Sequence, residues 1–113
     1  MEKDEQTLIK NETKKLKKIF NRIDEERKKI VLTLIKQVAF LSVELDILQD
    51  DIINNGAVET YQNGQNQKGK KISSACQTYN NLLKTYNASI KLLLNELPKN
   101  DVGNSEIMEF LSK

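Results

Sequence analysis

The 113-residue chain contains no histidine and only one cysteine. Without histidine it lacks the most common general base and every histidine-based metal site or catalytic triad. A single cysteine has no partner for an intrachain disulfide, which fits a protein of a reducing cytoplasm. The sequence has no run of about 18 apolar residues and so predicts no membrane span. Its N-terminal segment lacks the apolar core of a signal peptide.

Groups suited to catalysis are scarce among the residues that are present. The four glycines form neither a P-loop nor a dinucleotide fingerprint. Cys76 belongs to a hydrophobic repeat and has no basic neighbour placed to activate it, which favours a buried structural thiol over a nucleophile. The acidic residues between Glu44 and Asp51 fall on different sides of a predicted helix, which favours a solvated surface over a metal site. We therefore expect no enzymatic activity, no metal and no cofactor.

The strongest pattern in the chain is a pair of hydrophobic repeats of equal length. Their members recur every three and four positions, which keeps one seam of an α-helix turned toward a partner helix. Each seam extends over about 32 Å at a rise of about 1.5 Å per residue, so the two helices match in length. We predict an antiparallel helical hairpin joined by residues 53–75. The two seams are Val31, Leu34, Val38, Leu41, Leu45, Leu48 and Ile52, and Cys76, Tyr79, Leu83, Tyr86, Ile90, Leu93 and Leu97.

Further patterns extend this hairpin to a single all-α domain over residues 1–98. A first helix is expected over residues 4–23, and Asp24 then caps the second helix, which runs to about Asn55. The apolar face of the second helix is wider than one partner covers, so a third helix or self-association is expected. The stripe of the first helix is Leu8, Leu16, Ile19, Phe20 and Ile23, and the flanking residues of the second are Ile30, Ile35, Phe40 and Ile47.

The connection between the two long helices is polar and carries three of the four glycines. It forms either an irregular turn or a short β-hairpin, in which Val58–Gln62 pairs with Lys70–Ile72 around an Asn-Gly turn. Ser73 or Ser74 caps the third helix, and the single proline stops it. Residues 99–113 are expected to be a flexible tail, either disordered or a tethered docking peptide, because so short an amphipathic helix is marginal in water.

Two groups of basic residues are candidates for contact with phosphate. One lies on the first helix, whose acids gather at its ends and leave a positive centre, and the other lies in the connecting loop. The net charge of +2 is too near balance to identify a nucleic-acid binder, so a solvated surface stays the alternative to DNA contact for both groups. The groups are Lys14, Lys15, Lys17, Lys18 and Arg22, and Lys68, Lys70 and Lys71.

The loop and the third helix contain four sequence elements in a distinctive order. They are a YQNG-x-NQ-x-G-x-K loop at Tyr61–Lys71, small residues at 73–75, a YN-x(5)-YN pair at Tyr79 and Tyr86, and a leucine-rich end at Leu97 before the proline. This order resembles the small terminase subunit of tailed bacteriophages. The long preceding helix is similar as well, so the resemblance covers about residues 15–98.

The resemblance implies a protein of the infected bacterial host's cytoplasm that recognises the packaging site on double-stranded viral DNA. Such subunits assemble into rings and recruit a large subunit, whose ATPase drives packaging and whose nuclease cuts the genome. On this chain the helical hairpin would be the oligomerisation core, and both basic groups would contact DNA. The residues that would dock the large subunit are Ile107, Met108, Phe110 and Leu111.

The chain departs from this family pattern at its N-terminal end. Many small terminases have an N-terminal helix-turn-helix domain, whereas residues 1–27 hold a single predicted helix. The alternative function is a structural coiled-coil adaptor that binds protein partners and not DNA, which the near-neutral charge and uninterrupted repeats favour.

Overall fold

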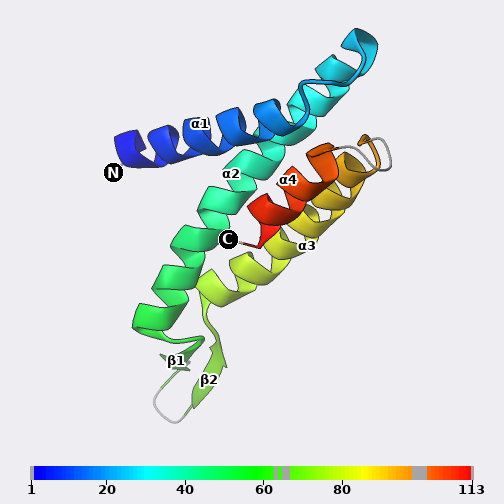
Figure 1. Ribbon diagram of the computed structural model, residues 1–113. Helices are drawn as coiled ribbons and strands as arrows, with labels where there is room; N and C mark the ends of the chain where they lie inside the picture. The colour runs from blue at the N-terminus through cyan, green and yellow to red at the C-terminus, as the bar shows by residue number, and fades with distance from the viewer. Residues whose placement is uncertain (1, 63, 65–66, 98–101, 113) are drawn as a thin grey trace.

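The computed structural model describes residues 2–62, 64, 67–97 and 102–112. The molecule is elongated, with extents of 63 × 28 × 24 Å. Over the described residues it has four helices and one two-stranded antiparallel sheet (Figure 1). The chain is therefore mostly helical, as predicted, but the all-α class is too narrow because the connecting loop forms this small sheet.

The centre of the fold is the antiparallel pair of helices α2 (Glu25–Asn55) and α3 (Ser74–Leu94). Asp24 occupies the N-cap position of α2 in extended conformation, although its side chain makes no capping hydrogen bond. At the other end Gly56 has a φ of 90°, which favours glycine, and its N–H donates to the Ile52 carbonyl over 2.8 Å. The predicted bounds of this helix are confirmed.

The loop between the two helices forms a β-hairpin of strands β1 (Val58–Gln62) and β2 (Lys68–Ile72). The hairpin alternative is thus confirmed, with the second strand beginning two residues earlier than predicted. Ser73 follows the hairpin at once, and its N–H donates to the Ala57 carbonyl over 2.8 Å. Its hydroxyl accepts a hydrogen bond from the Cys76 N–H at 3.0 Å and so caps α3. One serine therefore joins the base of the hairpin to the start of the helix.

Helix α1 (Glu2–Ile19) packs across α2, with its C-terminal half nearest the pair (Figure 1). It ends four residues before the predicted limit, although the Phe20 N–H still donates to the Leu16 carbonyl at 3.1 Å. Leu16 is fully buried and Phe20 is 3% exposed. Leu8, from the same predicted stripe, is 50% exposed, since the N-terminal half of α1 diverges from α2. The stripe therefore packs only over its second half.

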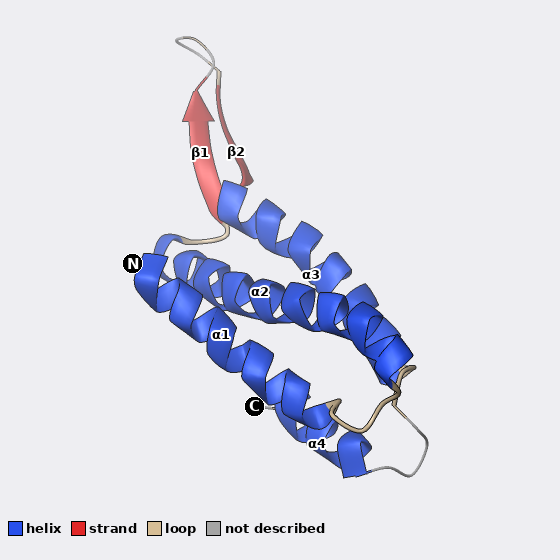
Figure 2. Ribbon diagram, turned by 90° about the horizontal axis from the view of Figure 1, so that it is seen from above, coloured by secondary structure: helices blue, strands red, loops and turns tan. Residues whose placement is uncertain are grey.

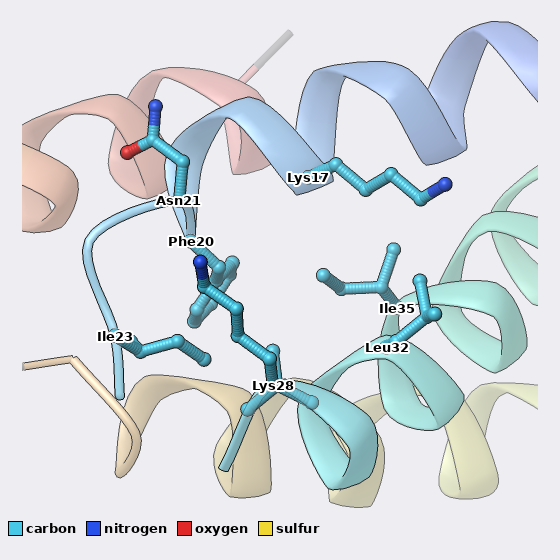
Figure 3. Close-up of a pocket in the computed structure, with 8 residues that line it drawn as sticks. Lys17, Phe20, Asn21, Ile23, Lys28, Leu32 and Ile35 are labelled. Atoms are coloured by element: carbon cyan, nitrogen blue, oxygen red, sulfur yellow. The ribbon is translucent and has the colours of Figure 1, made fainter. Parts of the chain in front are cut away.

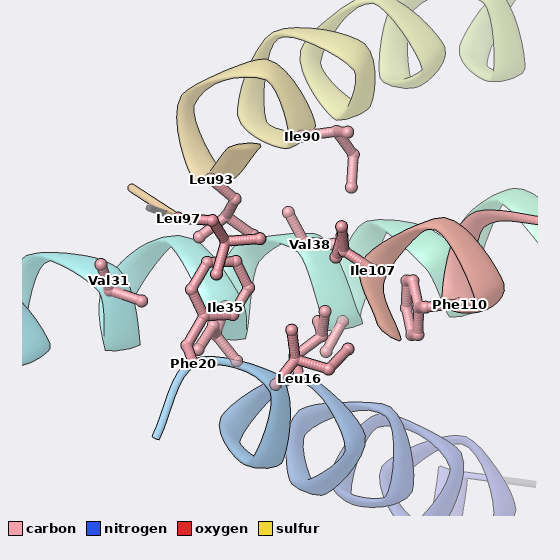
Figure 4. Close-up of a cluster of buried hydrophobic side chains, with 12 residues drawn as sticks. Leu16, Phe20, Val31, Ile35, Val38, Ile90, Leu93, Leu97, Ile107 and Phe110 are labelled. Atoms are coloured by element: carbon pink, nitrogen blue, oxygen red, sulfur yellow. The ribbon is translucent and has the colours of Figure 1, made fainter. Parts of the chain in front are cut away.

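The expected flexible tail differs from the structure. Residues Val102–Leu111 form helix α4, which lies beside α1 (Figure 2). Ile107 is 1% exposed and Phe110 is 7% exposed, because core residues of the other three helices surround them (Figure 4). This apolar contact stabilises a helix that would be marginal alone. The predicted stop at Pro98 lies outside the described residues.

The main core lies in the half of the molecule away from the β-hairpin. Toward the hairpin, seam residues such as Leu48 and Leu83 are only half-buried, since α1 and α4 do not extend over that end (Figure 1). On α2, Ile35 is buried, but Ile30, Phe40 and Ile47 are 61%, 47% and 43% exposed. The added helices thus cover part of the wide apolar face and leave the rest open. The core cluster is Leu16, Ile19, Phe20, Val31, Ile35, Val38, Ala39, Ile90, Leu93, Leu97, Ile107 and Phe110.

An ion pair between Arg27 and Glu96 links the start of α2 to the turn that follows α3. The guanidinium Nε and Nη2 lie 2.6 and 2.8 Å from the two carboxylate oxygens. These hydrogen bonds hold the pKa of Glu96 below its ordinary value of 4.5. A carboxylate whose pKa is lowered by folding stabilises the folded state above its unfolded pKa, and this stabilisation is lost as the pH falls through the folded pKa.

We therefore expect Glu96→Gln to be less stable than the wild type at neutral pH and to lose less stability below about pH 4.5. Urea unfolding followed by circular dichroism across this range measures the effect. Glu25→Gln is the control, because Glu25 is 88% exposed and pairs with Lys28 within one helix. Parallel pH curves for Glu96→Gln and the wild type would contradict the prediction.

Candidate nucleic-acid interface

The β1–β2 hairpin projects from one end of the α2–α3 pair, away from α1 and α4 (Figures 1 and 2). Most side chains of both strands are exposed, including those of Lys68, Lys70 and Lys71. A two-stranded hairpin is marginal by itself, and here Ser73 ties its base to the helices. The hairpin is therefore an anchored arm that displays all three predicted lysines.

The pairing register gives this arm two chemically different faces. In an antiparallel pair, directly opposed residues place their side chains on the same face, and successive residues alternate. Thr60 is opposite Lys70 and Gln62 is opposite Lys68, so these four side chains share one face, called here the polar face. Neither lysine makes an ion pair with a described residue, and the strand positions of this face include no acid.

The opposite face of the arm is already occupied by contacts within the hairpin. Glu59 is opposite Lys71, and their Oε1 and Nζ atoms lie 3.3 Å apart. Tyr61 is opposite Gly69, and a Cβ at position 69 would lie 2.7 Å from the Tyr61 hydroxyl oxygen. Glycine therefore lets the tyrosine ring lie across the neighbouring strand. This face offers less free positive charge than the polar face.

The basic residues of α1 lie in a more acidic environment than the sequence suggested. The Lys15 Nζ is 3.5 Å from the Glu12 carboxylate. With Lys18, it also borders a hollow of about 480 Å³ that Glu106 and Glu109 of α4 line from the other side. These carboxylates reduce the positive potential over this part of α1. The exposed basic side chains here are Lys14, Lys15, Lys17, Lys18 and Arg22.

A second pocket, which the sequence analysis did not identify, lies where α1 turns into α2 (Figure 3). Its volume is about 250 Å³, and Phe20, Ile23 and Leu32 are among its apolar lining residues. Lys17 and Lys28 stand at its edge (Figure 3), and the Lys28 Nζ is 2.8 Å from the Glu25 carboxylate. The apolar and basic residues at positions 17–35 were visible in the sequence, but their convergence depends on the angle between the two helices.

The residues expected to dock a large subunit are mostly turned inward. Ile107 and Phe110 belong to the core, and Leu111 packs against it partly buried. Met108 is 63% exposed. Met108 is therefore the most exposed of these four residues and the one most accessible to a partner.

The remaining candidates for chemistry are placed as follows. Cys76 is half-buried in the first turn of α3, beside its capping serine. Burial raises the pKa of the Tyr86 hydroxyl above its ordinary value of 10.0.

Within the described ranges, no three residues of the types histidine, cysteine, aspartate and glutamate form a group able to hold a metal ion. None of the described helices combines the length and apolar character needed to cross a lipid bilayer.

The two basic groups lie on separate parts of the molecule. The hairpin lysines are at one end of the long helical pair, and the α1 lysines are near the α1–α4 contact (Figure 1). Both groups are recognisable in the sequence, but their separation depends on how the helices pack. Comparison of the chain with protein-family models, with curated proteins and with solved structures gives no match.

Proposed function

We propose that the chain is a DNA-packaging adaptor of the small-terminase kind, which binds double-stranded viral DNA in the cytoplasm of an infected bacterium. The observation that carries this proposal is the anchored β-hairpin beyond the end of the helical pair, on which Lys68 and Lys70 form no ion pair with a described residue. Exposed lysines on a strand of a projecting hairpin suit contact with the phosphates of a duplex. The sequence resemblance of the same loop and helix supports the proposal.

The hairpin is a better candidate for the DNA contact than α1. Glu106 and Glu109 lie beside Lys15 and Lys18, so approach of a phosphate to that surface also meets two carboxylates. No strand residue on the polar face of the hairpin is acidic. In this proposal the lysines of α1 contribute long-range attraction, and Lys68 and Lys70 of the hairpin make the closer contact.

Self-association in a ring is proposed to use the uncovered side of the α2–α3 pair. Ile30 and Leu92 are 61% and 53% exposed, and together with Leu34 they line a hollow of about 520 Å³ between the two helices. An apolar surface of this kind is typical of a contact between copies. A large ATPase and nuclease subunit would then contact the exposed side of α4 around Met108.

Light scattering of the native protein, with and without duplex DNA, tests this proposal. We expect a mass of several protomers for the wild type and for Leu8→Asp, and a lower mass for Leu92→Asp. Leu8 is the matched control because it is also an exposed leucine, at 50%, but lies on α1 away from the hollow. A charge at Leu92 would have to be buried against the neighbouring copy, which is unfavourable.

Two results would count against the packaging adaptor. A monomeric wild type under both conditions would contradict the assembly on which it depends. An assembled protein without salt-sensitive DNA binding would favour the structural adaptor that binds protein alone. The observation that favours this second function is that acids of α4 line the same hollow as the lysines of α1, which lowers the positive potential there.

A further inference from the structure

The two faces of the β-hairpin differ in what they leave available to a ligand. On the polar face, Lys68 and Lys70 have no ion-pair partner among the described residues. On the other face, Lys71 is held by Glu59 at 3.3 Å and Tyr61 lies against Gly69. An anionic ligand approaching the arm is therefore attracted to one face in preference to the other.

The shape of the arm suits the major groove of duplex DNA. Two paired strands lie about 4.8 Å apart, and the major groove, about 12 Å wide, admits a two-stranded β-ribbon. The arm extends beyond the helices in both views (Figures 1 and 2), so the body of the protein does not obstruct its approach. The minor groove, about 6 Å wide, is too narrow for a ribbon lying flat.

The polar face also carries side chains that can contact base edges. Gln62 donates one amide hydrogen to the Gly64 carbonyl at 3.0 Å, which holds the side chain in place and leaves its oxygen and second hydrogen available. Glutamine pairs with adenine through these two groups, and a threonine such as Thr60 contacts several bases. Lys68 and Lys70 are placed opposite these two residues, where they can reach the flanking phosphates.

We propose that the β-hairpin inserts into the major groove of duplex DNA with its polar face toward the bases and the Glu59–Tyr61–Lys71 face toward solvent. This inference rests on the proposed DNA-binding function and adds to it the groove, the element and its orientation. The contact is made by Thr60, Gln62, Lys68 and Lys70. Val58 and Ile72 continue the same face toward the helices, and both are exposed, at 56% and 44%.

The test compares Lys70→Gln with Lys71→Gln, which are adjacent residues on opposite faces and lose the same charge. Binding to a mixed-sequence DNA duplex is measured over a series of salt concentrations. We expect Lys70→Gln to weaken binding. It should also reduce the magnitude of the slope of the log binding constant against log salt concentration by about 1 for each hairpin engaged. Lys71→Gln should leave both the affinity and this slope nearly unchanged. Glu59→Gln combined with Lys71→Gln removes the ion pair without changing net charge, so it controls for release of the Glu59 carboxylate.

A competition measurement identifies the groove. Methyl green, which occupies the major groove, is expected to displace the wild-type protein, and netropsin, which occupies the minor groove, is not. The reverse pattern would overturn the major-groove assignment, and equal losses for Lys70→Gln and Lys71→Gln would overturn the orientation. If the wild type binds DNA and Lys70→Gln binds it equally well, the hairpin is not part of the DNA interface. The proposed DNA-binding function would then stand without it. A wild type that binds no duplex would overturn both.

Discussion

Replacing Leu16 by alanine should lower the free energy of unfolding by about 2–5 kcal/mol, the range for truncating a buried leucine. Leu16 is fully buried in the cluster that joins all four helices, so the lost methyl groups leave a cavity as well as removing contacts. Leu8→Ala should change the same quantity by less than about 0.5 kcal/mol, because Leu8 is 50% exposed. Urea unfolding monitored by circular dichroism measures both.

This pair of variants separates packing from helix propensity. Both substitutions replace leucine by alanine within α1, and both positions belong to the same predicted stripe. Similar small losses in the two variants would mean that α1 does not pack against α2 as the structure places it. Similar large losses would mean that the N-terminal half of α1 is also buried.

Ile107→Ala should destabilise the protein by a similar amount, about 2–5 kcal/mol. Ile107 is 1% exposed, and its side chain packs from α4 against core residues of the other helices (Figure 4). Its neighbour Met108 is 63% exposed, so Met108→Ala should change stability by less than about 0.5 kcal/mol. The same unfolding measurement applies.

The outcome decides between an integral helix and a detachable tail. If residues after 98 were only a tethered docking peptide, both substitutions would leave the unfolding of the helical hairpin unchanged. A large effect at Ile107 alone would show that α4 contributes to the core in solution. A larger loss for Met108→Ala than for Ile107→Ala would contradict the orientation of the helix.

Elements whose limits depend on local chemistry were predictable from the sequence. Asp24 and Gly56 bound α2 where the sequence placed them, and Ser73 caps α3. The Asn-Gly signal indicated a hairpin, and the structure contains the paired strands β1 and β2. These features depend on short-range hydrogen bonds and backbone conformation, which a few neighbouring residues determine.

Features that depend on distant contacts were not predictable in the same way. The tail sequence shows a short amphipathic pattern, but whether such a helix forms depends on a surface to pack against, and α1 provides it from the other end of the chain. The hairpin lysines are exposed, which both DNA contact and a solvated surface require. The acids that α4 places beside Lys15 and Lys18 were not anticipated, since nothing in the sequence brings residues 15 and 106 together.

The core takes side chains from both ends of the sequence, from Leu16 on α1 to Phe110 on α4, and this affects how the protein folds during synthesis. Contacts between residues so far apart in sequence must close a long loop before they contribute any stability. While the ribosome is still making α3, Leu16 and Phe20 have no α4 to cover them. The nascent chain therefore exposes part of its apolar core surface until residue 110 has emerged, and during this interval it is more prone to aggregation than the finished fold.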